Sequence, residues 1–347
     1  MAYEKRSADR TALQKLKQDL RAGQPQNLYV FFGEESYLRR YYLKQLRELC
    51  GGVFPAFNVV TLNAEQVSVE TLGDAVDSVP MGSERKLVVV RDYKLMQPTG
   101  DMKEYLPQLL GNLPEYVCLV FSFETLEFKP DKRLNLWKLI EEKGQVVEFA
   151  QSASDSLIPW IKSHFEAHGK AIGTKECEYL LFLCGASMDN LLTEIDKIAA
   201  GTVGGVIEQS DIDALGSRVL EATVFELTDS VAEGKQARAL TILRDLFDMK
   251  QEPVAILAAV TKQFQRLYGA KLISAAGKGE NEAASLLEYR STYPAKRALQ
   301  SARQFSLPRL RKAQQMCLEA DVAMKSNLPD DQRTLELLLF RLAEDAR

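Results

Sequence analysis

The sequence predicts an α/β domain followed by two all-α domains, and three observations carry this prediction. In roughly the first 150 residues, short apolar segments alternate with segments of helical period. A polar stretch at Ser152–Ser156 interrupts this alternation. Beyond it the periodic segments are all helical. We therefore expect an α/β domain at residues 1–150, a small helical domain at residues 151–216 and a helical domain at residues 217–347.

The first domain is predicted to contain a parallel sheet. Five strand candidates are apolar over most of their length: Leu28–Phe32, Asn58–Leu62, Leu87–Arg91, Tyr116–Phe123 and Val146–Phe149. The helical patterns are Leu13–Leu20 before the first strand and, between the strands, Tyr37–Leu49, Val69–Ser78, Met102–Leu110 and Lys132–Glu142. Strands that are apolar throughout and separated by helices are typical of a parallel sheet with both faces covered.

The second domain is predicted from three helical patterns and one short helix. The patterns are Leu157–His168, Thr174–Leu183 and Met188–Ala200, and Ser210–Asp213 has the composition of a helix cap. Ser156 is the expected N-cap of the first of these helices, because a serine hydroxyl accepts a hydrogen bond from a free backbone N–H. Three or four short helices make a small domain.

The third domain is predicted to be a helical bundle. Its helices are expected at Val224–Glu233, Lys235–Met249, Pro253–Ala270, Asn281–Leu287, Tyr293–Gln304, Leu307–Ser326 and Asp331–Asp345. The segment Thr334–Leu342 is apolar on most sides of a helix, so we expect the last helix to be buried in the bundle.

Composition limits the classes of function. The chain has 347 residues, is 46% hydrophobic and 27% charged, and has a formal net charge of −4, which disfavours a protein that coats nucleic acid by charge alone. Its five cysteines form no C-x-x-C pair, so we expect buried reduced thiols. The first ten residues are polar and no apolar run is long enough to span a bilayer, so we expect a cytoplasmic protein without membrane contact.

The turn after Leu28–Phe32 is the first candidate for a functional site. Its residues are Gly33, Glu34, Glu35 and Ser36. A working phosphate loop reads G-x-x-x-x-G-K-[ST], in which glycine lets backbone N–H groups surround the phosphates and lysine balances their charge. Here one glycine remains, and two carboxylates would repel a polyphosphate. The turn predicts a degenerate phosphate loop that binds no nucleotide. The alternative is an ordinary strand-to-helix turn capped by acids.

Other catalytic candidates are weak. His164 and His168 have the i,i+4 spacing that can place two imidazoles on one metal, but the acid between them is displaced from the H-E-x-x-H position. We favour two solvated histidines near a helix end. Asp92 follows a strand and could hold a metal-bound water, but Tyr93 cannot supply a second acid, and a surface pair of Arg91 with Asp92 is favoured. We expect no metal, no cofactor and no intrinsic catalysis.

The segment Ser78–Lys86 joins a helix to a central strand and carries an apolar tip. Val79, Pro80 and Met81 could enter an apolar pocket on another protein, since Pro80 lowers the entropy lost on docking and methionine adapts to irregular surfaces. The alternative is that these residues pack beneath their own sheet. The sequence leaves both interpretations open.

These features together resemble the delta subunit family of the bacterial DNA polymerase III clamp loader, over essentially the whole chain. No single motif is decisive, but the order and spacing of several segments are specific. The segments are Leu28–Leu38, Val79–Val90, Asp131–Arg133, Asp189–Ile198, Val224–Asp229, Ala255–Ala258 with Gln263 and Phe264, and Ala320–Lys325.

The resemblance implies an AAA+-type α/β domain with a degenerate phosphate loop, a small helical lid and a C-terminal helical collar. It implies that the collar holds the chain in a ring with the gamma or tau ATPase subunits and the delta-prime subunit. It further implies that the chain itself hydrolyses no ATP, although the holoenzyme is classed as a DNA-directed DNA polymerase. Its role would be to bind the sliding clamp, called beta, and to open this ring for loading onto primed DNA during replication.

By the same resemblance, Val79, Pro80 and Met81 form the clamp-binding element. The chain departs from the family pattern here, because aromatic residues are common after the proline and this chain has Met81 and Gly82. Two alternatives remain from the residues alone. One is an active ATPase with an unusual phosphate loop, and the other is a helical scaffold of a different multiprotein complex.

Overall fold

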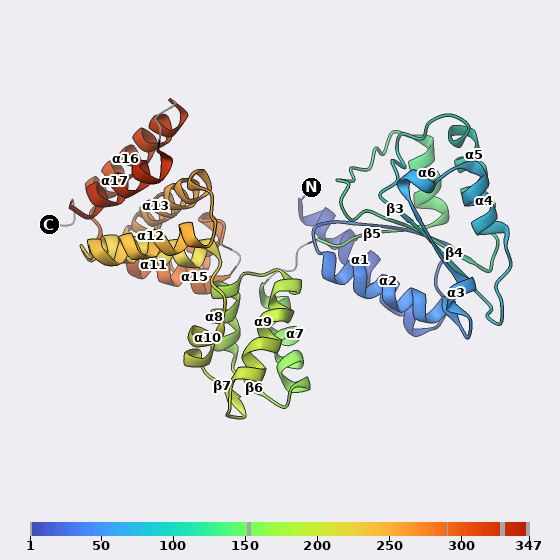
Figure 1. Ribbon diagram of the computed structural model, residues 1–347, viewed down its shortest axis with the longest axis horizontal. Coiled ribbons are helices and arrows are strands. Elements are labelled where there is room, and N and C mark those ends of the chain that lie inside the picture. Colours follow the sequence, from blue (N-terminus) through green and yellow to red (C-terminus); the bar gives the residue numbers. More distant parts are fainter. Residues whose placement is uncertain (1, 151–153, 290, 327–329, 345–347) are drawn as a thin grey trace. The chain divides into compact units, whose positions relative to one another are not determined.

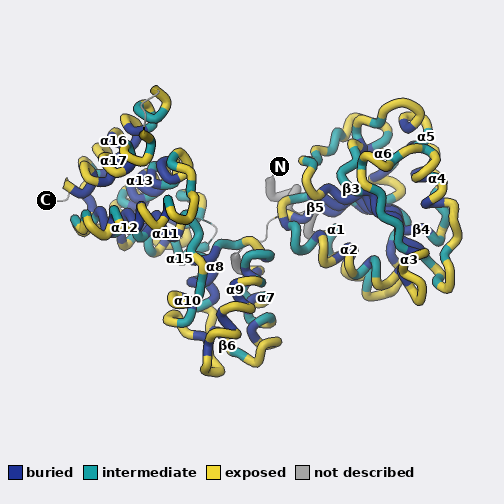
Figure 2. The backbone as a smooth tube through the Cα atoms, in the orientation of Figure 1, coloured by how far each residue is buried: buried dark blue, intermediate teal, exposed yellow. Residues whose placement is uncertain are grey.

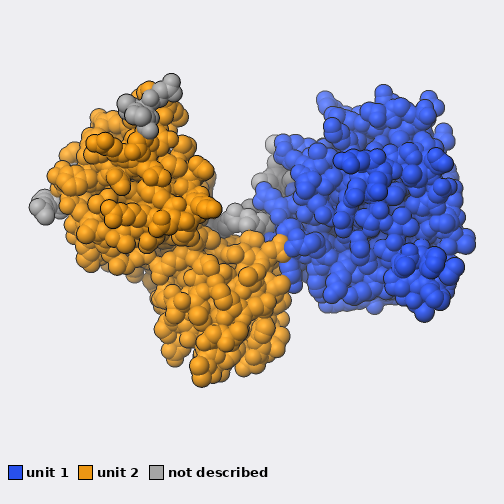
Figure 3. Space-filling model, viewed as in Figure 1, with its two compact units in different colours: residues 1–151 blue, residues 152–347 orange. Residues whose placement is uncertain are grey.

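A computed structural model describes residues 2–150, 154–289, 291–326 and 330–344. The chain divides into two compact units, Met1–Gln151 and Ser152–Arg347, which Figure 3 shows in different colours. Each unit is described by itself below. The predicted division into three domains, with a boundary inside the second unit, stays a prediction.

The first unit is built on a five-stranded sheet in the order β2-β3-β4-β1-β5, in which all the pairings are parallel (Figure 1). The register places Val30 between Phe121 and Val146. The strands are β1 (Leu28–Phe32), β2 (Val59–Asn63), β3 (Lys86–Arg91), β4 (Val117–Ser122) and β5 (Gln145–Glu148). Each lies within one residue of its predicted position at either end, and the predicted class of an α/β part followed by helices is confirmed.

Side chains of successive strand residues enter two separate cores, because they alternate between the faces of the sheet. Tyr29 and Phe31 pack with α1 (Ala2–Arg21) and α2 (Ser36–Gly51). Leu28, Val30 and Phe32 pack on the opposite face with three helices. These helices are α4 (Val69–Asp77), α5 (Met102–Gly111) and α6 (Asn135–Lys143). Figure 2 shows a dark, buried band through this sheet. Strands β1, β3 and β4 are buried along nearly their whole length, which explains their nearly uniform apolar sequence, whereas the edge strand β2 is only partly buried.

Two short elements of the first unit were not predicted. The helix α3 (Pro55–Asn58) has only four residues and begins with proline at its first position, and a 3₁₀ turn, η1, covers Ala64–Gln66. Four residues are too few for a helical period to be read from sequence. The first helix is also longer than predicted, since α1 extends from Ala2 and not from Leu13.

The second unit begins with four helices and a pair of two-residue strands. The helices are α7 (Ser154–Ala167), α8 (Thr174–Cys184), α9 (Met188–Gly201) and α10 (Gln209–Leu215), and the strands β6 (Ala171–Ile172) and β7 (Val206–Ile207) pair in parallel. The prediction of Ser156 as N-cap is wrong, because the helix already contains Ser154 and Ser156 is its third described residue.

Most of the remaining helices of the second unit share one large apolar core, and α14 packs in a smaller cluster with residues of α13 and α15. They are α11 (Leu220–Ala232), α12 (Gln236–Asp248), α13 (Pro253–Ala275), α14 (Glu280–Leu286), α15 (Thr292–Ser301), α16 (Leu307–Lys325) and α17 (Asp331–Glu344), with the 3₁₀ turn η2 (Ala302–Gln304) after α15. The prediction that the last helix is buried is only half right. Leu335 and Leu338 are buried, but Leu337 and Phe340 are exposed on the other side of α17.

The five cysteines are all buried and free, as predicted for reduced thiols. Burial raises the pKa of Cys177 and of Cys317 to about 11, so both stay protonated and unreactive near neutral pH. Within the described ranges, no helix is both long and apolar enough to cross a membrane.

Candidate functional site

The loop after β1 is closed by the chain itself. Gly33 has φ of +118°, and a Cβ added to it would lie 2.5 Å from the carbonyl oxygen of Phe149. The N–H of Glu35 donates to that same oxygen at 2.9 Å. On the other side of the turn, Nη1 of the buried Arg39 donates to the carbonyl oxygen of Gly33 at 2.7 Å. Two backbone groups of the loop thus have partners within the first unit.

This geometry differs from that of a phosphate loop, in which successive N–H groups point toward the ligand. The N–H of Glu35 points to Phe149, Glu35 itself is buried, and Glu34 is exposed. The alternative of an acid-capped turn is also wrong in detail. Helix α2 starts at Ser36, and Glu35 at the N-cap position makes no side-chain cap hydrogen bond.

Asp92, which follows β3, holds the loop that follows β4. Its carboxylate accepts hydrogen bonds from the N–H groups of Glu124, Thr125 and Leu126 at 2.7–3.3 Å and from the Thr125 hydroxyl at 2.8 Å. Burial acts to raise the pKa of Asp92, but these hydrogen bonds outweigh it and place the pKa below its ordinary value of 3.8. The favoured surface pair with Arg91 is wrong, because Arg91 pairs with Glu124 at 3.3 Å.

The two histidines have separate partners. Nδ1 of His164 lies 2.9 Å from the carbonyl oxygen of Trp160, and the two rings are in contact. Nε2 of His168 lies 2.8 Å from Oδ1 of Asp196. Among the residues that the structure describes, no group of three or more His, Cys, Asp or Glu could hold a metal ion. The interpretation of two solvated histidines is only half right, because His168 is exposed whereas His164 is partly buried against Trp160.

The apolar tip before β3 is on the surface. Val79 is 75% exposed, Met81 is 50% exposed and Pro80 is partly exposed. The alternative that these side chains pack beneath their own sheet is therefore wrong. The tip lies at the edge of the sheet where the strands begin, whereas Gly33 lies at the edge where they end.

Two buried polar side chains hold the backbone of the tip. Asn58 is fully buried; its Nδ2 donates to the carbonyl oxygen of Met81 at 2.8 Å, and its Oδ1 accepts from the N–H of Met81 at 2.7 Å. Nζ of the buried Lys86 donates to the carbonyl oxygen of Ser78 at 2.8 Å and to its hydroxyl. Burial lowers the pKa of Lys86. The backbone of the tip is therefore held at both ends.

Sequence reasoning did not identify the exposed apolar residues of the segment before β2. Val53, Phe54 and Phe57 are exposed in and beside α3, next to the tip. A usable signal was present, because residues 49–64 contain no charged side chain and yet two glycines and a proline interrupt any long buried element.

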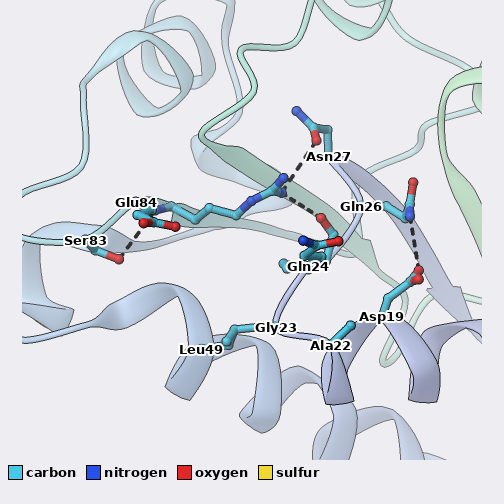
Figure 4. Close-up of a pocket in the computed structure, with 11 residues that line it drawn as sticks. Asp19, Ala22, Gly23, Gln24, Gln26, Asn27, Leu49, Ser83 and Glu84 are labelled. Atoms are coloured by element: carbon cyan, nitrogen blue, oxygen red, sulfur yellow. Dashed lines mark hydrogen bonds between the residues drawn. The ribbon is translucent and has the colours of Figure 1, made fainter.

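A polar pocket of about 650 Å³ lies beside the start of β1 (Figure 4). The turn Ala22–Asn27 forms one wall, and Ser83, Glu84 and Arg85 form another. Nη1 of Arg85 donates to the carbonyl oxygen of Pro25 at 2.6 Å. This contact ties the segment between the tip and β3 to the turn before β1, and we assign the pocket no ligand.

The fold and these loops define a protein with a parallel α/β unit, a closed loop at the phosphate-binding position and a helical second unit. Two family models match the chain: DNA polymerase III, delta subunit, over residues 29–150, and DNA polymerase III delta subunit, C-terminal domain, over residues 221–342. Together they cover more than half of the sequence, and the chain belongs to the DNA polymerase III delta subunit family.

Similarity to individual proteins supports this family assignment. DNA polymerase III subunit delta of Bacillus subtilis (strain 168) is 26% identical over 333 residues, which cover 93% of this chain and 94% of that protein. A probable delta subunit of Aquifex aeolicus (strain VF5) is 24% identical over 267 residues, 74% of each chain. The solved structure of the Bacillus subtilis DNA clamp loader delta protein matches with a TM-score of 0.54 at 24% identity, over 95% of this chain and 99% of that one, and so shares the fold.

Replacement of Gly33 is expected to destabilise the first unit. Gly33→Ala places a Cβ against Phe149 at a positive φ, which should cost about 2–3 kcal/mol. In a Trp160→Phe background, fluorescence of the buried Trp137 reports urea unfolding of this unit. Gly100→Ala is the matched control, since Gly100 also has a positive φ but nothing lies within 4 Å of the added Cβ. Equal losses for both variants would contradict the close contact.

The carboxylate of Asp92 is expected to stabilise the first unit in a pH-dependent way. Because the folded pKa is lowered, the contribution is fully present above 3.8 and is lost as the pH falls through the folded pKa. Asp92→Asn should lower the free energy of unfolding by about 1–2 kcal/mol at neutral pH, and the difference should shrink below about pH 4. Urea midpoints of Trp137 fluorescence measure it, with the exposed Asp74→Asn as control. A pH-independent difference would refute the assignment.

Proposed function

We propose that this chain is a clamp-opening subunit that binds the sliding clamp through Val79, Pro80 and Met81. Membership of the delta subunit family supports this role. The observation that carries the proposal is an exposed apolar tip whose backbone is held on both sides by buried polar side chains, Asn58 and Lys86. Exposed apolar groups in a fixed conformation are typical of protein docking sites.

Ring opening follows from differential binding in this proposal. Such a subunit binds the clamp more tightly when one interface of the ring is open. It thereby shifts the population toward the open ring, without hydrolysing ATP itself. The closed loop at Gly33 and the hydrogen-bonded Asp92 support a role without nucleotide. The chain would act in the cytoplasm, where the assembled loader meets primed DNA.

The C-terminal helices supply a second proposed contact, with the gamma or tau ATPase subunits and the delta-prime subunit. Leu318 and Val322 on α16, and Leu337 and Phe340 on α17, are exposed. The two helices pack together and are joined by an ion pair in which Nη2 of Arg341 lies 3.0 Å from Oε2 of Glu319. Apolar side chains beside this pair would be covered in the assembled ring.

Truncation of the tip is expected to weaken clamp binding. Met81→Ala should cost about 1–3 kcal/mol of binding free energy, the range for a buried interface anchor, and the Val79/Met81 double alanine variant should cost more. Surface plasmon resonance against the sliding clamp of the same organism measures the Kd. Leu134→Ala removes a partly exposed leucine at the start of α6 and serves as control. If the double variant binds as tightly as the parent chain, the assignment of the tip is wrong.

A polar substitution on α17 is expected to weaken assembly but not clamp binding. Phe340→Ser should reduce the affinity for the ATPase and delta-prime subunits by about tenfold, since it removes an apolar side chain that the ring would cover. Reconstitution at a series of concentrations, followed by size-exclusion chromatography, measures the change. Leu272→Ser, on an exposed position of α13, is the control. If the Phe340→Ser variant assembles like the parent chain, the proposed contact of α16 and α17 with the other subunits is wrong.

A further inference from the structure

The segment before β2 lies beside the tip because of the sheet topology. Strands β2 and β3 pair in parallel, with Val59 opposite Leu87. Helix α3 ends immediately before β2. The segment that carries the tip, residues 78–85, ends immediately before β3. Two segments that lead into paired parallel strands meet at the same edge of the sheet. In Figure 1, α3 lies at the end of α2, at this edge.

Direct contacts join the two segments. Gly82 has φ of +62°, and a Cβ added there would lie 3.1 Å from Cδ2 of Phe54, so the phenyl ring covers the backbone of the tip segment. A Cβ added at Gly52 would lie 2.8 Å from Cβ of Ser83. The amide of Asn58, the last residue of α3, bonds both backbone groups of Met81. These contacts make α3 and the tip one surface.

The shared surface is apolar and exposed. Val53 is 75% exposed, Phe57 is 63% exposed and Phe54 is 46% exposed. Eight large apolar side chains are exposed in the described part of the first unit, and five of them lie in these two segments: Val53, Phe54, Phe57, Val79 and Met81. Exposed apolar residues that are scattered singly over a surface need no explanation, but a cluster of this kind indicates an interaction site.

We propose that α3 is the second half of the docking surface, with Phe57 as its aromatic anchor against the sliding clamp. The inference rests on the proposed function of the tip. The chemistry favours a protein partner, because residues 49–64 and residues 78–83 contain no lysine or arginine to contact phosphates. The continuity of the surface with the tip assigns both segments to the same partner.

Phe57 supplies a kind of contact that the tip lacks. Val79, Pro80 and Met81 contain no aromatic ring, and Phe54 occupies the space above Gly82. Aromatic side chains commonly contribute most to interface affinity, because they bury a large rigid surface at little entropic cost. In this chain the aromatic contribution comes from a segment about 25 residues earlier in the sequence.

The test is the affinity of full-length variants for the sliding clamp of the same organism. Phe57→Ala should raise the Kd at least about tenfold, and Phe57→Leu should lie between the parent and the alanine variant. Leu134→Ala, at a partly exposed position in the same unit, should leave the Kd within about twofold. Thermal unfolding of each variant by circular dichroism verifies that the fold is intact.

The outcomes separate this inference from the proposed function. If the Val79/Met81 double alanine variant loses binding while Phe57→Ala binds like the parent, α3 is outside the interface and the inference is overturned alone. If both variants bind like the parent, the proposed docking tip fails as well. Sedimentation velocity without the clamp tests a second copy as occupant. Self-association that Phe57→Ala abolishes, with clamp affinity unchanged, overturns the inference.

Discussion

Burial of both faces of the five-stranded parallel sheet is the constraint on which the first unit depends. Helices α1 and α2 cover one face and α4, α5 and α6 cover the other, so side chains of β1, β3 and β4 are out of water on both sides. The loops that join strands to helices lie at the two edges of the sheet where the strands begin and end. Every strand of this sheet runs in the same direction. All the strands therefore begin at one edge of the sheet and end at the opposite edge.

The two loop edges have different chemistry. Ligands of parallel α/β sheets usually bind outside the carboxyl ends of the strands. In this chain that edge is tied together internally, by Phe149 with the loop of Gly33 and by Asp92 with the loop after β4. The opposite edge carries the exposed apolar side chains of α3 and the tip. The edge where the strands end is therefore bonded internally, whereas the edge where they begin exposes apolar side chains.

Asn58 shows how a buried polar residue can serve such a surface. Its side chain makes three hydrogen bonds, to both backbone groups of Met81 and to the carbonyl oxygen of Gly51, so its burial is compensated. The bonds hold the end of α2, α3 and the tip in one arrangement before any partner binds. A surface organised in advance loses less entropy on association, which favours tight binding from a small apolar area.

The sequence alone determined the class of fold, the strands and most helices, because continuous apolar runs and segments of helical period are local patterns. It also singled out Gly33–Ser36, whose residues depart from the phosphate-loop pattern, and Val79–Met81 as an apolar tip. Only the tertiary structure decided that the tip is exposed, that Phe149 closes the loop of Gly33, and that Phe54 and Phe57 adjoin Met81. It likewise decided that Leu337 and Phe340 of α17 are exposed, outside the large apolar core of the second unit. Contacts between segments distant in sequence depend on strand order and helix packing, which local patterns do not encode.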